Sequence, residues 1–284
     1  MNRHAYLIIA HNEPLVLQKL LTLLDDERND IYVHIDKRAN EMYEHFRNFK
    51  LDKSRLFILS DRLSVYWGDI SQLDVEYKLF ETASQTGEYS YFHLLSGVDL
   101  PIKSQDYIHD FFMRNEGKEF VGYWNSKGHL KDLDRKVYRY YFFTKYFKGG
   151  SPLVHGLTAF TRNIVLAVQK ITKFRRNQHF EFKKGFQWVS VTGDFCKYLI
   201  EQKEDVMKTF RYTLCPDEIF IQTVLWNSPF RSQIYSLDSA CEGSMRDIDW
   251  ERGHPYVWTT EDWQELMDSK YLFARKFSSS SLPK

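Results

Sequence analysis

The stretch AYLIIA, at residues 5–10, is a short and continuous apolar run. A run that is apolar at every position is typical of a strand buried on both faces of a sheet. Pro14 follows it and begins a segment with leucines at helical spacing, which predicts a helix. A second apolar run, at residues 31–35, ends at Asp36. The beginning of the chain therefore predicts a strand, a helix and a second strand in succession.

The same alternation continues through the first half of the chain. We expect further strands at residues 56–59, 89–95 and 119–123, and helices at residues 41–49, 71–82 and 104–113. Strands that alternate with helices indicate a largely parallel sheet covered on both faces. The predicted fold class is α/β, with a mostly parallel central sheet flanked by helices. Ligands of such sheets bind beyond the carboxyl ends of the strands, here the segments 11–13, 36–38, 64–68 and 96–99.

The composition fits a folded domain with a substantial core. The chain has 284 residues, of which 43% are hydrophobic and 17% are aromatic. Its net charge of +1 argues against a general binder of polyanions. Cys196, Cys215 and Cys241 show no CxxC spacing, so neither a zinc site nor a disulfide framework is expected. No apolar run reaches membrane-spanning length and no signal peptide opens the chain, so we expect a cytoplasmic protein.

A basic segment rich in aromatic residues interrupts the alternation. Between Arg135 and Lys184 there are twelve Lys and Arg residues and a single acid, Glu181. Residues 162–176 predict a helix with one apolar stripe, made by Ile164, Val168, Ile171 and Phe174. Such a helix can lie on an anionic membrane, here its inner face, and an ordinary surface helix is the alternative. None of the common nucleic-acid-binding signatures is present, and no nucleic-acid partner is expected.

The segment LCPDEIFIQT, at residues 214–223, contains the best candidate for a catalytic carboxylate. Pro216, Asp217 and Glu218 are ordinary helix-start residues, which is one interpretation. Alternatively, Glu218 can act as a general base, because a helix dipole at a cleft favours its ionised, proton-accepting form. Asp217 is expected to project elsewhere and to form local hydrogen bonds.

Two DxD strings are the candidates for a metal site. Asp132 and Asp134 are expected in a solvated turn, and Asp247 and Asp249 in a strand-like stretch. Only a lone acid, Asp99, stands at the strand end where a metal ligand would be expected, and a lone acid is a poor site for Mg²⁺. We therefore predict no metal cofactor, and expect fixed cations to stabilise developing negative charge instead.

Eight segments, taken in order, resemble those of the core-2/I-branching β-1,6-N-acetylglucosaminyltransferases and the peptide O-xylosyltransferases. They are YLIIAH (6–11), HIDK (34–37), VYWG (65–68), LLSGVDLPIK (94–103), GFQW (185–188), PDE (216–218), RDIDW (246–250) and LFARKF (272–277). None of them is specific alone, but the shared order spans nearly the whole chain. Animal members carry a membrane anchor, a stem and many disulfides, and this chain resembles a bacterial catalytic domain without them.

The resemblance implies a GT-A-type nucleotide-sugar transferase fold, an inverting mechanism, a UDP-sugar donor and no metal requirement. It implies that Glu218 is the base and that Arg246 and Lys276 neutralise the diphosphate, whereas Arg275 is expected to face solvent. It also implies a nucleotide pocket at the strand ends, built by Ala10, His11, Asp36, Trp67 and Gly68.

Further residues complete the predicted substrate site, and several have a structural alternative. Candidates for contact with the donor sugar are Ser96, Asp99, Gln187 and Trp188, with Asp217 beside them. The alternatives are a turn carboxylate for Asp36 and Asp99, a structural histidine for His11, core packing for Trp67, Gln187 and Trp188, and surface cations for Arg246 and Lys276.

The sequence thus predicts one glycosyltransferase domain at residues 1–277 and a flexible tail at 278–284. Within the domain, residues 1–124 would bind the nucleotide, 125–184 form the basic aromatic insertion, and 185–277 carry catalysis and the acceptor. The predicted reaction moves a sugar, GlcNAc first and xylose next, from a UDP donor to a hydroxyl of a glycan or lipid-linked glycan. The alternatives are a metal-dependent transferase of the same fold and a non-catalytic module that binds glycans or membranes.

Overall fold

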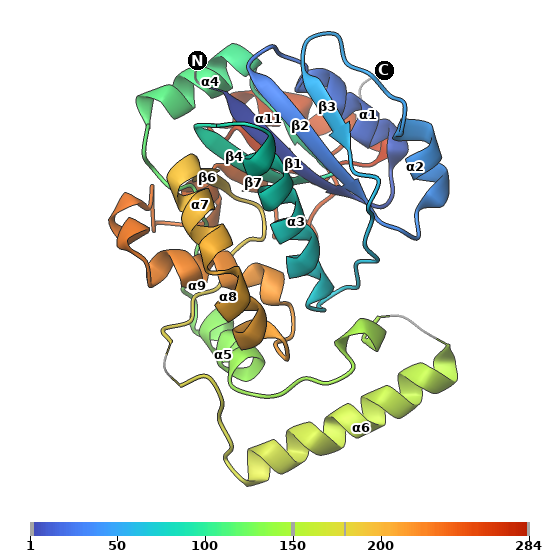
Figure 1. The fold of residues 1–284 in the computed structure, drawn as a ribbon, viewed down its shortest axis with the longest axis vertical. Helices are drawn as coiled ribbons and strands as arrows, with labels where there is room; N and C mark the ends of the chain where they lie inside the picture. Colours follow the sequence, from blue (N-terminus) through green and yellow to red (C-terminus); the bar gives the residue numbers. More distant parts are fainter. Residues whose placement is uncertain (1–2, 149–150, 179, 283–284) are drawn as a thin grey trace.

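A computed structural model of the chain describes residues 3–148, 151–178 and 180–282. Its centre is a five-stranded sheet with the order β3-β2-β1-β4-β6 (Figure 1). The strands are β1 (His4–Ala10), β2 (Asn29–Ile35), β3 (Arg55–Ile58), β4 (Tyr91–Ser96) and β6 (Ser190–Thr192). The first four are parallel and β6 runs antiparallel to β4, which confirms the predicted mostly parallel sheet.

β1 lies in the middle of this sheet and is buried at every position, as its continuous apolar sequence predicted. Its side chains alternate between two cores: Leu7 and Ile9 enter one, and Ile8 and Ala10 enter the other. Helices cover both faces. One face carries α3 (Ser71–Thr86) and α7 (Gly193–Glu201), and the other carries α1 (Pro14–Leu23), α2 (Asn40–Phe46) and α4 (Gln105–Arg114) (Figure 1).

The strand register aligns the carboxyl ends of the three central strands. The paired residues are Ala10 with Ile35, and Ile9 with Ser96. His11, Asp36 and Gly97, which follow these strands, therefore meet at one edge of the sheet. Gly97 is needed there because a Cβ would lie 2.7 Å from the Cβ of Ala10. This edge is where a parallel sheet binds its ligand.

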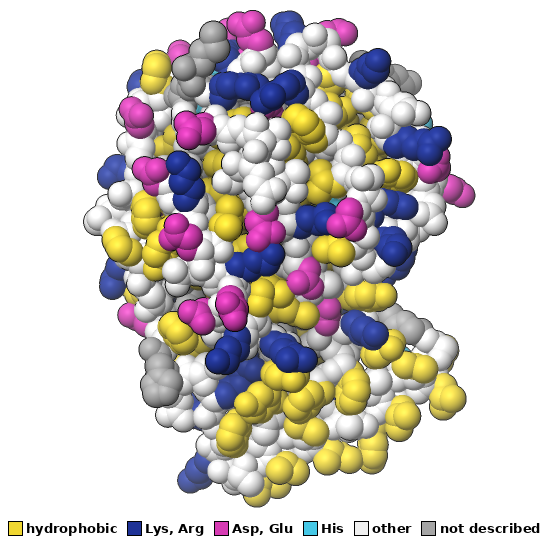
Figure 2. All heavy atoms as spheres, in the orientation of Figure 1, with side chains coloured by type: hydrophobic (Ala, Val, Ile, Leu, Met, Phe, Trp, Pro, Cys, Tyr) yellow, Lys and Arg dark blue, Asp and Glu magenta, His cyan; other side chains and the backbone are white. Residues whose placement is uncertain are grey.

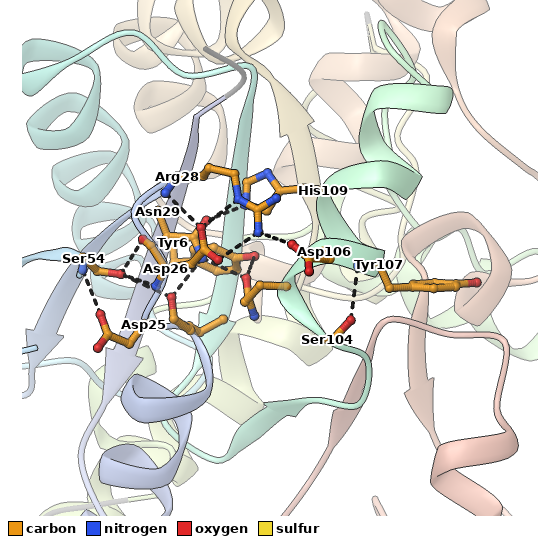
Figure 3. Close-up of polar contacts among 12 residues, drawn as sticks. Tyr6, Asp25, Asp26, Arg28, Asn29, Ser54, Ser104, Asp106, Tyr107 and His109 are labelled. Carbon is orange, nitrogen blue, oxygen red and sulfur yellow. Dashed lines mark hydrogen bonds and ion pairs between the residues drawn. The ribbon is translucent and has the colours of Figure 1, made fainter. Parts of the chain in front are cut away.

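A polar network closes the opposite, amino edge of the sheet (Figure 3). Asn29 at the start of β2 donates to Oε1 of Gln105 at 2.8 Å and contacts Nε2 of His109 at 2.9 Å. Arg28, the preceding residue, pairs with Asp106 at 2.7 Å. The network joins the start of β2 to α4, so these polar side chains are explained by structure.

A second, three-stranded sheet brings the C-terminal part of the chain to the ligand edge. Its order is β5-β8-β7, with β5 at Asp99–Pro101, β8 at Phe273–Arg275 and β7 at Arg246–Ile248. β8 pairs antiparallel with β5, which places Arg275 opposite Asp99. The sequence did not predict this sheet, because three-residue strands are too short to show a hydrophobic period.

The helix predicted at residues 162–176 begins earlier and ends sooner. It is α6 (Pro152–Ile171), and its Ser151 cap accepts a hydrogen bond from the Val154 N–H. Beyond its end, Lys173 has a left-handed backbone with φ of +54°. η1 (Thr144–Tyr146) and α5 (Lys127–Val137) precede α6 in the same segment. α6 runs along the edge of the molecule away from the central sheet (Figure 1).

Residues 119–123 form isolated bridges instead of the predicted strand. Glu119 bridges to Ile234, and Phe120 bridges to Ser190. Close backbone packing replaces further pairing, because a Cβ at Gly122 would lie 2.3 Å from the carbonyl oxygen of Ala240.

The remaining helical elements are short and lie in the second half of the chain. They are α8 (Lys203–Phe210), η2 (Pro216–Glu218), α9 (Phe220–Trp226), η3 (Pro229–Gln233), α10 (Ala240–Ser244), η4 (Thr260–Asp262), α11 (Trp263–Asp268) and η5 (Ser279–Ser281). η5 is a capped turn with Ser281 buried, and residues 283–284 lie outside the described residues; the flexible tail at 278–284 stays a prediction. Among the described helices, none is long and apolar enough to cross a membrane.

Candidate active site

A cavity of about 670 Å³ opens at the carboxyl edge of the central sheet. Nine of the predicted site residues line it: Ala10, His11, Asp36, Trp67, Ser96, Gln187, Trp188, Asp217 and Glu218. Gly68, Asp99, Arg246 and Lys276 are not among its lining residues. The edge expected from the strand order is thus the edge that holds the cavity.

Asp36 is buried in the cavity wall and organises the loops around it. Its Oδ1 and Oδ2 accept from Nε and Nη2 of Arg38 at 2.9 and 2.8 Å, and the Val65 N–H donates to Oδ2 at 3.0 Å. Burial alone would raise the pKa of Asp36, but the Arg38 and Val65 donors outweigh burial and lower it. Asp36 is therefore an ionised acceptor that both shapes the turn and faces the cavity.

Trp67 stands on the outer side of the cavity and is 45% exposed, so it is not a core residue. Its ring lies 5.4 Å from the ring of Phe147, and Nζ of Lys148 lies 3.7 Å from its centroid. Gly68 has a positive φ of 71°, and its carbonyl accepts from the Cys215 N–H at 3.0 Å. Gly68 therefore fixes the Trp67 loop against the segment that carries Glu218.

Arg275 lines the cavity, and the expectation that it faces solvent is wrong. Its Nη1 donates to Oδ1 of Asp99 at 2.8 Å and also to the Ser96 hydroxyl. The guanidinium carbon lies 4.6 Å from the centroid of the Trp188 ring. Asp99 is buried and accepts the Ser96 N–H at 2.8 Å. Asp99 therefore closes its turn and orients Arg275, instead of lining the cavity itself.

Arg246 is buried and does not line the cavity, which corrects its expected position. It is buried and donates to the carbonyls of Ser244 and Val189 at 2.6 and 2.9 Å, and to the Ser190 hydroxyl at 2.9 Å. Burial lowers the pKa of Arg246 to about 10. Lys276 is half-buried and follows Arg275. Lys276 is not among the residues that line the cavity, and its assignment to the diphosphate stays a prediction.

Glu218 ends the short 3₁₀ turn η2, and α9 begins only at Phe220. Its Oε2 lies 3.1 Å from Nζ of Lys184 and 3.4 Å from Nζ of Lys136. The side chain of Glu218 is 31% exposed, whereas both lysine side chains are buried. The two ammonium groups hold the carboxylate in place, while part of it remains accessible.

Lys136 and Lys184 also contact Asp132 on α5. Oδ2 of Asp132 lies 2.6 Å from Nζ of Lys184 and 3.1 Å from Nζ of Lys136. Burial alone would lower the pKa of Lys136, but Glu218, Cys215 and Asp132 together outweigh burial and raise it. Burial alone would raise the pKa of Asp132, but Lys184 and Lys136 lower it. Two cations and two anions therefore form a balanced cluster beside the cavity.

Asp217 is buried next to Glu218, and burial together with the charge of Glu218 raises its pKa. Among the described residues its Oδ1 has no hydrogen-bond partner, in contrast to the local bonding expected of it. Glu76 on α3 is fully buried and accepts from Nε2 of Gln187 at 2.7 Å. Burial and the charge of Asp217 raise the pKa of Glu76. Both carboxyls are therefore biased toward their neutral forms.

The two DxD strings are engaged in other contacts. Asp132 and Asp134 lie on α5 and not in the solvated turn expected for them; Asp134 pairs with Arg175 at 2.6 Å. Asp247 accepts from the Ser269 hydroxyl at 2.6 Å. In the part of the chain that the structure describes, no group of three or more His, Cys, Asp or Glu side chains is placed to hold a metal ion. Metal independence stays a prediction.

A second cavity, of about 520 Å³, adjoins the first and shares Glu218 with it. Its walls include the aromatic residues Trp67, Trp124, Phe147 and Trp250, and the cluster residues Asp132, Lys136 and Lys184. Broad aromatic faces with a few polar groups suit the binding of a sugar ring. Glu218 therefore stands where two binding spaces meet.

Sequence reasoning missed Arg275, Lys136 and Lys184 as residues of this site. Arg275 was passed over because its partner Asp99 was considered alone. The two lysines were counted with the basic segment and assigned to an external anion. The sequence gives no signal for the contacts of Lys136 and Lys184 with Glu218, because both lysines are far from Glu218 along the chain.

Comparison with known proteins places the chain in a family. The model of the Core-2/I-Branching enzyme family matches residues 4–268. Xylosyltransferase oxt of Drosophila melanogaster is 24% identical over 296 residues, which cover 97% of this chain and 32% of that protein. Xylosyltransferase 2 of Rattus norvegicus is 24% identical over 299 residues, which cover 98% of this chain and 32% of that protein. The chain thus spans about a third of the length of these relatives.

Among solved structures, mouse xyloside xylosyltransferase 1 in its apo form is 9% identical, with a TM-score of 0.40 and full coverage of both chains. The family model, the mostly parallel sheet and the cavity at its carboxyl edge agree with the predicted α/β, GT-A-type fold. Because the family model matches nearly all of the sequence, the resemblance carried by the eight ordered segments is confirmed, and the chain belongs to the core-2/I-branching enzyme family.

Proposed function

We propose that this protein is an inverting glycosyltransferase that moves a sugar from a UDP donor to a glycan hydroxyl. The observation that carries the proposal is the position of Glu218, a partly exposed carboxylate at the junction of two cavities. The first cavity lies at the carboxyl edge of the sheet, where nucleotides bind in α/β folds. The second has the aromatic walls expected of an acceptor-sugar site.

In the proposed reaction Glu218 takes the proton of the acceptor hydroxyl. The acceptor oxygen then forms a bond with the anomeric carbon of the donor, while the bond from that carbon to the diphosphate oxygen breaks. UDP departs with the electron pair of the broken bond, and the configuration at the anomeric carbon is inverted. General base catalysis of this kind contributes about 10²–10⁴-fold to a rate.

The departing diphosphate needs positive charge, and Arg275 is the cation we assign to it. Asp99 and Ser96 fix its Nη1 and Trp188 lies beside its plane, so the guanidinium is held in one orientation at the cavity. Fixed donors aimed at developing charge stabilise it without reorganisation. Lys145 and Lys148 line the same cavity and add positive charge near its mouth. The proposal needs no metal ion; a metal-dependent reaction on the same fold is the alternative.

The donor sugar is proposed as GlcNAc or xylose. The resemblance to the branching N-acetylglucosaminyltransferases of the Core-2/I-Branching enzyme family favours GlcNAc. The two relatives reported above are named xylosyltransferases, which favours xylose. Gln187 and Trp188, which line the same cavity, are the residues that we expect to contact this sugar. A non-catalytic glycan-binding module would keep both cavities and would have no use for the base.

The test combines calorimetry with UDP and transfer assays with UDP-GlcNAc and UDP-xylose, each with and without EDTA. We expect UDP to bind in EDTA, and one donor to be consumed. Glu218→Gln should lower turnover by about 10²–10⁴-fold and leave UDP affinity within about threefold. Arg275→Met should weaken UDP binding by about tenfold or more. The control is Glu116→Gln, at an exposed glutamate far from the cavities.

The outcomes separate the alternatives. Wild-type turnover in Glu218→Gln would show that another group is the base. UDP binding that is lost in EDTA would favour the metal-dependent transferase. Binding of UDP or glycans without transfer of either sugar would favour the non-catalytic module.

A further inference from the structure

α6 turns a continuous apolar face toward the outside of the molecule. Leu153, Leu157, Phe160 and Ile171 are 82%, 65%, 64% and 81% exposed, and Ile164 and Val168 lie between them at 47% and 53%. These six residues, the α6 stripe, recur at spacings of three and four and so lie on one side of the helix. Figure 2 shows hydrophobic side chains gathered along this edge of the molecule.

The opposite side of α6, which faces the protein, combines the packed Leu166 with two buried polar side chains. Arg162 is buried, with its guanidinium carbon 4.4 Å from the centroid of the Phe147 ring. Gln169 is buried and exchanges two hydrogen bonds with the backbone of Tyr140, at 2.7 and 3.1 Å. An ordinary surface helix buries its apolar side and exposes its polar side. α6 instead exposes most of its large apolar residues and buries Arg162 and Gln169, and an exposed stripe of this length marks a surface that is covered by something else.

The charges around the stripe favour an anionic partner. α6 contains no acidic residue. Exposed lysines stand near both ends of α6: Lys145 and Lys148 precede it, Lys170 lies in its last turn, and Lys173 follows it. A second copy of the chain, stacked on the same stripe, would bring these lysines close to equal charges, which disfavours self-association. Negatively charged lipid headgroups complement them.

We propose that α6 docks this protein on a membrane that contains anionic phospholipids. The helix lies in the plane of the interface, with the α6 stripe among the acyl chains and the lysines at the headgroups. Its 20 residues give a contact about 30 Å long, at about 1.5 Å per residue. The helix does not span the bilayer, in agreement with the absence of a membrane-crossing helix among the described residues.

Docking through α6 would place the second cavity close to the lipid surface. Phe147, which lines that cavity, contacts Arg162 of α6, and the Tyr146 carbonyl lies 3.1 Å from Nδ1 of His155 on the same helix. A glycan carried on a membrane lipid would then meet the cavity at the height of the headgroups. The docking itself depends only on α6 and its flanks, and it is independent of the transfer reaction.

Flotation of the full chain with liposomes tests the proposal without any sugar substrate. One set of liposomes is pure phosphatidylcholine, and the other contains about 30% phosphatidylglycerol, which gives its surface the negative potential that attracts lysines. We expect binding to the anionic set, and a loss of about tenfold or more in partitioning for the double variant Leu157→Ser, Phe160→Ser. The double variant Lys170→Gln, Lys173→Gln should lose about tenfold on anionic liposomes.

Matched controls and a second measurement keep the result clear. Leu15→Ser with Met113→Ser removes exposed apolar side chains, 57% and 56% exposed, from α1 and α4, and should partition like the wild type. Light scattering reports the oligomeric state of each variant. Wild-type protein that ignores both liposome sets would overturn the proposal, and so would a dimer that the α6 variants convert to a monomer.

Discussion

The folded basic segment, residues 135–184, has two regions with similar charge and opposite surroundings: its first and last residues meet at the Glu218 end, and its middle forms the α6 end. At the Glu218 end, Lys136 and Lys184 are buried and each contacts two carboxylates. At the α6 end, Lys148 and Lys170 are exposed and stand beside exposed apolar side chains. Burying an ammonium group is favourable only when carboxylates compensate its lost hydration, whereas an exposed lysine needs no partner. One run of basic sequence therefore serves both the interior of the site and an outer surface.

The largest difference between the two ends should appear when one lysine is removed from each. Lys184→Met leaves Asp132 and Glu218 with Lys136 alone, so the free energy of unfolding should fall by about 2–3 kcal/mol. Lys148→Met is the matched change at an exposed site and should cost less than about 0.5 kcal/mol. Urea unfolding measures both values. Equal losses in the two variants would contradict the contrast between the ends.

A smaller effect should appear in the pH dependence of stability. The pKa of Asp132 is lower in the folded protein than its ordinary value near 4, because Lys184 and Lys136 favour the ionised form. Its contribution is therefore present above about pH 4 and is lost as the pH falls below that value. Asp132→Asn should lower stability by about 1 kcal/mol at pH 7 and approach the wild type in acid.

Urea unfolding at a series of pH values measures this difference. Asp134→Asn, at the more exposed carboxylate of the same helix, is the control. It should change the loss of stability at acidic pH less than Asp132→Asn does. A constant gap between Asp132→Asn and the wild type at every pH would show that the ion pairs do not stabilise the cluster.

The smallest effect is expected on α6 itself. Leu157→Ser and Phe160→Ser should each change the free energy of unfolding by less than about 0.5 kcal/mol, because both side chains are already exposed. Leu166 lies on the side of α6 that packs against Tyr141, Leu214 and Cys215. Leu166→Ser should therefore lower the free energy of unfolding by more, about 1–2 kcal/mol. Thermal unfolding of the three variants measures the order. A large loss in Leu157→Ser would mean that the α6 stripe packs on the protein after all.

Much of the fold could be predicted because its decisive segments are local. The run at β1 and the second run at β2 are apolar at every position, and the structure buries both strands completely. Pro14 begins α1 as expected. The three-residue strands β5, β7 and β8 carry no such pattern, so the second sheet could not be inferred.

The candidate site was predictable where it follows the strand ends and not where it depends on distant pairs. His11, Asp36 and Ser96 follow from the rule that parallel strands end at one edge. The sequence could not show that Arg275 lines the cavity or that Arg246 is buried outside it, because both placements depend on the second sheet. The role given to Lys276 stays a prediction.

The pairing of β8 with β5 has a consequence for the order in which the site can form during synthesis. Arg275 and Asp99 are 176 residues apart in sequence. The strands of the parallel sheet through β4 leave the ribosome long before β8, so the sheet edge exists in the nascent chain without its arginine. Domains fold as their residues emerge, and contacts of such long separation form last. A polypeptide released before β8 would therefore carry the strand ends but lack the cation that Asp99 orients, and the cell would hold an incomplete site until translation passes residue 275.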